Sequence, residues 1–288
     1  MKVVSDCKIQ LFADDTIIYV SGDRAEEIIQ KINNDLHNIF QWLNNNCLQL
    51  NVSKTKSMII RNKHINLNLQ ADVKINSEIV ERVNTFVYLV CVIDEHLSFT
   101  EHYKYILNKI AKKVNVLGRS SKMLSSWTKL NIYKTIIAPH FHFCSTLLFL
   151  MNNSEIDALQ RKQNRAMRII LGCDYFTRRT DMLHATNLLS VRQILTYNTM
   201  IFIYKMLNNL LPPHLLSNCR FVKDVHEHNT RSKNNFYIDK VNTSFSQNSL
   251  YYKGLKQYNE LPDYIKNCDN LQSFKACCKV FVKEIIEI

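Results

Sequence analysis

The sequence has 288 residues, 46% of them hydrophobic, so it is long enough to bury a core in one large domain or two small ones. Only four Gly and four Pro are present, which disfavours an all-β sandwich rich in tight turns. The net charge of +12 and the pI of about 9.2 favour polyanionic partners, although an ordinary basic surface would give the same balance.

The nine cysteines include no Cys-x-x-Cys pair with a second pair at zinc spacing, so we expect reduced thiols. The first residues hold no apolar stretch of signal-peptide length, and secretion is not expected. The longest apolar stretch, residues 136–151, is short for a membrane span and contains Pro139, His140 and His142. It predicts a buried helix, and the reduced thiols indicate an intracellular protein.

Residues 8–20 predict a β-hairpin, in which strands 8–13 and 16–20 flank a tight turn at Asp14 and Asp15. A helix is predicted over residues 24–46, because apolar residues recur there every three or four positions. Short strands are expected next, in segments rich in β-branched or aromatic residues: 56–61, 71–75, 78–80 and 86–93.

The character of the chain changes after Asp94. Residues 100–211 predict an almost wholly helical region, and the polar, Asn-rich residues 220–288 predict short pieces followed by a terminal helix over residues 273–286. We therefore expect an α+β fold with three parts, at residues 1–97, 98–219 and 220–288.

Two adjacent carboxylates between apolar strands can serve as metal ligands. A tight turn can bring Asp14 and Asp15 to one side, and Mg²⁺ prefers carboxylate and phosphate oxygens. Two such ions stabilise the attacking and leaving oxygens of an in-line phosphoryl displacement. The alternative is a solvated turn, and two carboxylates rarely suffice without a third.

Several ordered motifs resemble the reverse transcriptases of non-long-terminal-repeat, LINE-type retrotransposons of the jockey kind. The string LFADDT at residues 11–16 is similar to their [FY]-x-D-D box, and WLNNNCLQLNVSKTKSM at residues 42–58 is similar to the segment that follows it. FVYLVCVIDEHLSFTEHY at residues 86–103 resembles the primer-grip region, except that Val90 stands where Gly is usual. Similarity continues into residues 133–149, 159–172 and 229–281.

The resemblance implies the C-terminal half of a polymerase palm, a helical thumb and a post-thumb region in the three parts above. It implies an RNA-directed DNA polymerase that uses Mg²⁺ and acts on an RNA template, an RNA–DNA hybrid and deoxynucleoside triphosphates. It also implies residence in the nucleus or cytoplasm, without a membrane partner. Asp14 and Asp15 would be the catalytic metal ligands. Positioning of the nucleotide or primer would fall to the rest of the box and to three later residues: Phe12, Ala13, Lys54, Tyr88 and Leu89. The alternatives are a solvated surface side chain for Lys54 and ordinary core packing for Tyr88 and Leu89.

Two basic clusters in the helical part suit contacts to a nucleic-acid backbone. Spacings of four and three place Arg161, Arg165 and Arg168 on one helix face, and a second cluster contains Lys109, Lys112 and Lys113. The alternative is a solvated basic face.

Only 13 residues precede Asp14, whereas the resemblance implies fingers and a further catalytic Asp ahead of the box. We expect the sequence to be a polymerase fragment that is inactive by itself and binds Mg²⁺ weakly. The alternatives are a non-catalytic nucleic-acid-binding remnant that uses the basic helical half, and a decayed element without function.

Overall fold

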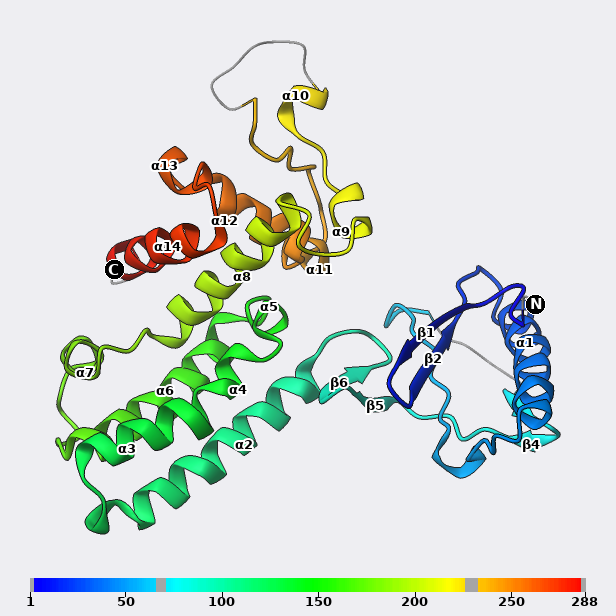
Figure 1. Cartoon of the computed structure of the whole chain (residues 1–288), viewed down its shortest axis with the longest axis horizontal. Coiled ribbons are helices and arrows are strands. Elements are labelled where there is room, and N and C mark those ends of the chain that lie inside the picture. Colours follow the sequence, from blue (N-terminus) through cyan, green and yellow to red (C-terminus); the bar gives the residue numbers. More distant parts are fainter. Residues whose placement is uncertain (1–2, 66–70, 226–232, 286–288) are drawn as a thin grey trace. The chain divides into compact units, whose positions relative to one another are not determined.

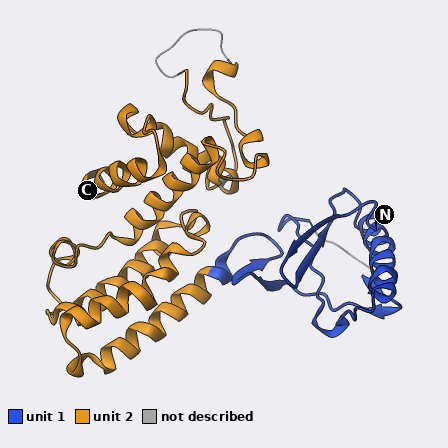
Figure 2. Ribbon diagram, viewed as in Figure 1, with its two compact units in different colours: residues 1–102 blue, residues 103–288 orange. Residues whose placement is uncertain are grey.

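The computed structural model describes residues 3–65, 71–225 and 233–285, which form two compact units (Figures 1 and 2). The first unit comprises residues 1–102 and the second residues 103–288. The structure is a mixture of helices and short antiparallel strand pairs, as the sequence predicts. The assignment of its parts to palm, thumb and post-thumb region remains a prediction.

The described part of the first unit contains three separate two-stranded antiparallel sheets and one long helix. Its elements are β1 (Lys8–Phe12), β2 (Asp15–Tyr19), α1 (Ala25–Asn45), η1 (Val52–Lys54), β3 (Lys74–Ile75), β4 (Glu78–Ile79), β5 (Thr85–Tyr88) and β6 (Cys91–Asp94). The predicted hairpin and helix are confirmed.

Two predicted strands were wrong. Residues 56–61 form only an isolated bridge between Ser57 and Arg82. Residues 86–93 fold back on themselves as the β5–β6 hairpin, because Leu89 and Val90 both adopt positive φ angles, of 45° and 69°, and turn the chain. A run of β-branched residues conceals such a turn, since these side chains normally avoid that conformation.

Helix α1 organises the core of the first unit. Its apolar stripe packs Ile29 and Leu36 against Val73, Ile75 and Val80. The Asn33 side chain fixes the β3 segment, accepting from the Lys74 N–H at 2.8 Å and donating to the Asp72 carbonyl at 3.1 Å. Burial of these apolar side chains is the main favourable term for this unit.

The described part of the second unit is helical. Its elements are α2 (Thr100–Arg119), which begins in the first unit, η2 (Ser121–Met123), α3 (Ser126–Ile132), η3 (Tyr133–Ile137), α4 (Pro139–His142), α5 (Ser145–Leu148), α6 (Asn153–Leu171), α7 (Arg179–Thr186), α8 (Val191–Leu207), α9 (His214–Ser217), α10 (Val222–Val225), α11 (Ser244–Gln247), η4 (Leu250–Gly254), α12 (Leu255–Asn259), α13 (Asp263–Lys266) and α14 (Leu271–Ile285).

The apolar stretch at residues 136–151 is buried, with Ile137, Phe141 and Leu148 fully enclosed. It is not one helix, because Cys144 adopts a left-handed conformation (φ 51°) and separates α4 from α5. Of the helices formed by the described residues, none combines the length and apolar character of a membrane span.

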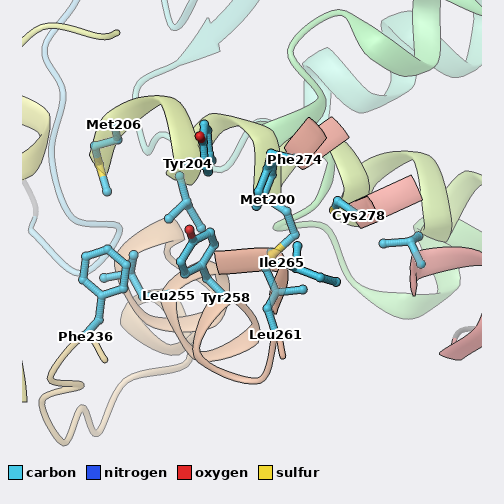
Figure 3. Close-up of a cluster of buried hydrophobic side chains, with 12 residues drawn as sticks. Met200, Tyr204, Met206, Phe236, Leu255, Tyr258, Leu261, Ile265, Phe274 and Cys278 are labelled. Carbon is cyan, nitrogen blue, oxygen red and sulfur yellow. The ribbon is translucent and has the colours of Figure 1, made fainter. Parts of the chain in front are cut away.

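Helix α8 forms a core with the C-terminal segment (Figure 3). Tyr204 stacks on Phe274 of α14 with ring centroids 4.1 Å apart, and its hydroxyl donates to the Cys268 carbonyl at 2.8 Å. Tyr258 and Phe236 extend the aromatic cluster. Residues after 233 thus share a core with α8.

Helix α6 is held by a buried network of polar side chains. The Gln163 amide donates to the Tyr133 hydroxyl at 3.0 Å and to the Leu189 carbonyl at 2.8 Å. The Gln160 amide donates to Gln163, and its oxygen accepts from the Val191 N–H at 2.8 Å. An Asn152 capping box begins the helix. These bonds fix α6 against η3 and the start of α8, and so determine which face of α6 reaches solvent.

Candidate functional site

The two carboxylates lie at the tip of the β1–β2 hairpin. Phe12 pairs with Asp15, so Ala13 and Asp14 form a two-residue connection. Such short connections require a positive φ angle, and Ala13 adopts φ 51°. The structure therefore places Asp14 within the turn and Asp15 at the first position of the returning strand, so the turn lies one residue earlier than the predicted turn at Asp14 and Asp15.

Both carboxylates are exposed, and neither makes a hydrogen bond or ion pair with any described residue. The two side chains offer four oxygen atoms of the type that Mg²⁺ prefers. Within residues 3–65, 71–225 and 233–285, no third His, Cys, Asp or Glu lies close enough to complete a three-residue metal-binding group with them. The pair therefore fits Mg²⁺ in ligand type, and substrate, water or another segment must complete the coordination.

Asp35 of α1 fastens the chain leading into β1. Its buried carboxylate accepts hydrogen bonds from the backbone N–H groups of Ser5, Asp6 and Cys7 at 2.9, 3.0 and 2.7 Å, and from the Ser5 hydroxyl at 2.9 Å. Burial by itself raises the pKa of Asp35, but these donors outweigh it and hold the pKa well below its usual range. Ile18 of β2 also packs against the α1 core. Together these contacts position the hairpin that carries Asp14 and Asp15.

The hairpin is otherwise open to solvent. Every residue of β1 is exposed, including Ile9, Leu11 and Phe12, and Tyr19 of β2 is exposed as well. A two-stranded sheet with apolar residues on its surface is marginal in water and is normally completed by further strands or a cover.

The other predicted site residues of this unit lie on separate elements. Lys54 is exposed at the end of η1, whose first turn is capped by the Asn51 side chain. Tyr88 ends β5, and its buried hydroxyl has no hydrogen-bond partner among the described residues. Half-buried Leu89 is the first residue of the following turn. No described hydrogen bond or ion pair joins Lys54 or Tyr88 to Asp14 or Asp15.

Asp94 is a second buried carboxylate with a structural role. It accepts from the backbone N–H groups of His96, Ser98 and Phe99 at 3.0, 3.0 and 2.7 Å, and from the Ser98 hydroxyl at 3.2 Å. Burial opposes ionisation, but the donors prevail and the pKa of Asp94 is lowered. This loop leads directly into α2.

Sequence reasoning missed Asp35 and did not assign a role to Asp94. The signal for Asp35 was its place on the buried stripe of α1, next to Leu36, where an ionised side chain must find donors. The donors are backbone groups from distant residues, and their identity is not visible in the sequence.

The predicted lysines on α2 differ in their surroundings. Lys112 is exposed, the Lys109 ammonium lies 4.8 Å from the Tyr105 ring centroid, and the Lys113 ammonium donates to the Ile136 carbonyl at 3.1 Å. Residues 102–154 contain eight Lys or Arg and no Asp or Glu, so this segment carries a strong net positive charge.

The three arginines of α6 also differ in their exposure to solvent. Arg161 and Arg165 are exposed, whereas Arg168 is half-buried. The Arg168 guanidinium donates to the Tyr175 carbonyl at 3.0 Å and lies 5.0 Å from the Tyr175 ring centroid. Arg161 and Arg165 are therefore available to a phosphate, while Arg168 is already engaged.

No protein-family model and no solved structure matches the chain. Among curated proteins, it is 29% identical over 175 residues to a probable RNA-directed DNA polymerase from transposon X-element of Drosophila melanogaster, which covers 59% of the chain and 19% of that relative. It is 24% identical over 192 residues to the probable RNA-directed DNA polymerase from transposon BS of the same organism. This match covers 65% of the chain and 21% of that relative. It is 23% identical over 181 residues to the RNA-directed DNA polymerase from mobile element jockey of Drosophila melanogaster. This match covers 62% of the chain and 19% of that relative.

These similarities confirm the family resemblance. The chain is a distant homologue of the RNA-directed DNA polymerases of jockey-like non-LTR retrotransposons. The matched segments make up about a fifth of the length of these relatives.

Proposed function

We propose that the chain forms the C-terminal half of the palm, the thumb and the post-thumb region of an RNA-directed DNA polymerase. The observation that supports this most directly is the pair of exposed, unpartnered carboxylates at a hairpin tip, in a chain homologous to such polymerases. The substrates would be an RNA template, a primer annealed to it and deoxynucleoside triphosphates.

In the proposed reaction, the primer 3′-hydroxyl loses its proton to solvent and its oxygen attacks the α-phosphorus of the nucleotide. The bond between the α-phosphorus and the oxygen that bridges to the β-phosphorus breaks, and pyrophosphate leaves. Asp14 and Asp15 would hold Mg²⁺ at this centre. Bound Mg²⁺ would stabilise charge on the attacking and leaving oxygens. Asp35 would act at a distance, by holding the strand approach that sets the position of the hairpin.

We also propose that the 288 residues do not polymerise without further palm and finger residues. The Asp pair lacks a third carboxylate within the described residues, and the apolar surface of β1 is open where further strands would pack. Two carboxylates alone would hold Mg²⁺ weakly, because most of its ligands would be water.

A chimaera tests the catalytic assignment. The segment of the X-element relative that precedes its matched region would be fused to this chain, and Mg²⁺-dependent primer extension on an RNA template would be measured. We expect extension by the chimaera, its abolition by Asp14→Asn and by Asp15→Asn, and no effect of Asp23→Asn, which changes an exposed carboxylate beyond the same hairpin. Extension by the 288-residue chain alone would contradict the need for additional residues.

A second candidate function is nucleic-acid binding without catalysis, supported by the exposed Arg161 and Arg165 on α6. The slope of log affinity against log salt falls by roughly 0.7–0.9 for each phosphate contact removed. The double variant Arg161→Ala/Arg165→Ala should therefore reduce the slope for an RNA–DNA hybrid by about 1.5.

The charge-matched control is Lys256→Ala/Lys279→Ala, which removes two exposed cations elsewhere in the second unit. An equal loss in both double variants would show that net charge, rather than the face of α6, governs binding. Hybrid affinity that is unchanged by Asp14→Asn, together with an inactive chimaera, would favour the non-catalytic function.

A further inference from the structure

The loop between α6 and α7 presents two aromatic rings to solvent. Tyr175 is 78% exposed and Phe176 is 89% exposed, and we refer to these two residues as the aromatic tip. Their ring centroids are 5.8 Å apart and their planes are nearly perpendicular, at 86°. Two adjacent aromatic side chains this exposed lose the stabilisation that burial would give them. Such exposed apolar patches commonly mark a binding surface.

The aromatic tip is braced by its own helix. Arg168 bonds the Tyr175 carbonyl at 3.0 Å and places its guanidinium against the Tyr175 ring, at 5.0 Å from the centroid. Gly172 ends α6 in the left-handed conformation (φ 67°) and its N–H donates to the Arg168 carbonyl at 2.8 Å. The position of Tyr175 relative to α6 is thus fixed before any ligand arrives.

The surroundings of the aromatic tip are strongly basic. Residues 161–179 contain six Lys or Arg and a single acidic residue, Asp174. Arg178 and Arg179 follow the aromatic tip after one intervening residue and are exposed, and Arg161 and Arg165 lie on the exposed face of the preceding helix. At about 1.5 Å per residue, Arg161 lies roughly 15 Å along the helix from its end, which is a length of a few nucleotides.

Exposed aromatic rings beside a row of cations are the combination that binds single-stranded nucleic acid, where bases stack on the rings and the backbone lies along the positive charge. In a duplex the bases stack on one another and are inaccessible to such rings. A protein partner would have to bring acidic groups to match the arginines, and the rings would then need only apolar contact.

We propose that the aromatic tip stacks unpaired bases of a nucleic-acid strand whose phosphates contact Arg161, Arg165, Arg178 and Arg179. This inference rests on the proposed function, which requires nucleic-acid binding, and adds to it a contact with unpaired bases rather than with the duplex backbone.

The experiment compares the affinity of the full chain for a labelled single-stranded 12-nucleotide oligomer with its affinity for an abasic oligomer of the same length. Both strands carry the same phosphates, so the ratio of the two affinities reports the contribution of the bases alone. Stacking of one base corresponds to a preference of roughly 5- to 150-fold for the base-containing strand. We expect at least about a tenfold preference, and its loss in Tyr175→Ala/Phe176→Ala with unchanged affinity for the abasic strand.

The matched control is Phe245→Ala/Tyr264→Ala, which removes two aromatic side chains that are 67% and 66% exposed in the same unit. It should keep the preference. A second variant, Tyr175→Leu/Phe176→Leu, keeps apolar area and removes the ring faces, so it should lose the preference as well. Because the replaced side chains are exposed, the thermal midpoints should match that of the parent chain.

Three outcomes would overturn the inference: no preference in the parent chain, a preference that survives in the Ala variant, or one that survives in the Leu variant. Salt-dependent binding without base preference would leave the proposed function standing, whereas no binding to any nucleic acid would remove both. Self-association that is lost in the Ala variant, without base preference, would assign the aromatic tip to protein contact instead.

Discussion

At the residue scale, several local features of this protein depend on single side chains in unusual surroundings. Val90 occupies a turn position with φ 69°, where a β-branched residue is disfavoured. The resemblance to reverse transcriptases points to the same position, because Gly is usual there. The sequence thus departs from the family motif at a position where the left-handed backbone favours glycine.

Replacing Val90 with Gly should therefore stabilise the first unit. Relief of the left-handed conformation should raise the free energy of unfolding by about 1 kcal/mol. The matched control is Val87→Gly in β5, where the same substitution should lower it by about 0.5–1 kcal/mol because glycine weakens a strand. Urea denaturation would measure the free energy of unfolding of both variants. A destabilised Val90→Gly variant would contradict the inference that Val90 is strained.

At the element scale, α6 is fixed by buried glutamines rather than by apolar contact alone. Gln163 is fully buried and serves Tyr133 and Leu189 at once. Burial raises the pKa of Tyr133 to about 12, although its bond with Gln163 acts in the opposite direction, so the hydroxyl stays protonated at neutral pH. Tyr133 and Gln163 lie in the segments 133–149 and 159–172, which resemble the family sequences. The hydrogen-bond network gives a structural reason for the presence of these two residues.

Substitution of Gln163 by Leu should destabilise the second unit by about 3 kcal/mol, because the Tyr133 hydroxyl and the Leu189 carbonyl lose their partner while remaining buried. The control is Gln272→Leu, an exposed glutamine on α14, which should change stability by less than about 0.5 kcal/mol. Thermal unfolding followed by circular dichroism would compare them. Equal effects would show that the network contributes nothing beyond helix propensity.

At the scale of the whole molecule, we expect the two units to lose stability over different pH ranges. Asp35 and Asp94 both lie in the first unit, and both have pKa values lowered in the folded state. A group with a lowered folded pKa stabilises the fold above its unfolded pKa, near 3.9, and this contribution is lost as pH falls through the folded pKa. Below about pH 5, acid should therefore weaken the first unit. In the second unit, burial lowers the pKa values of His140 and His142, so its loss of stability should begin at higher pH, near the unfolded histidine pKa of about 6.5.

Each unit contains one tryptophan, Trp42 in the first and Trp127 in the second, so variants with a single tryptophan report on each unit separately. In Trp127→Phe, the free energy of unfolding from urea titrations should fall between about pH 5 and pH 3, with Asp35 contributing a loss of about 1 kcal/mol. Asp94 should add a loss in the same direction. In Trp42→Phe, the free energy of unfolding should change less over the same range. The Asp35→Asn variant should make the stability of the first unit less dependent on pH. An unchanged slope of stability against pH would exclude Asp35 as the source of that dependence.

The sequence by itself determined the hairpin around Asp14 and Asp15, the long helix after it and the helical second half. These follow from local periodicity and from the motif resemblance, and both are properties of neighbouring residues. It could not reveal the turn at Leu89 and Val90, because their side chains disfavour the conformation that the surrounding fold imposes.

Only the tertiary structure decided which polar residues are structural and which are available. It made Asp35 an anchor, joined Gln163 to Tyr133, engaged Arg168 with Tyr175 and left the aromatic tip in solvent. The physical reason is that partners of buried polar groups come from segments distant in sequence, and exposure is set by packing over the whole chain rather than by residue type.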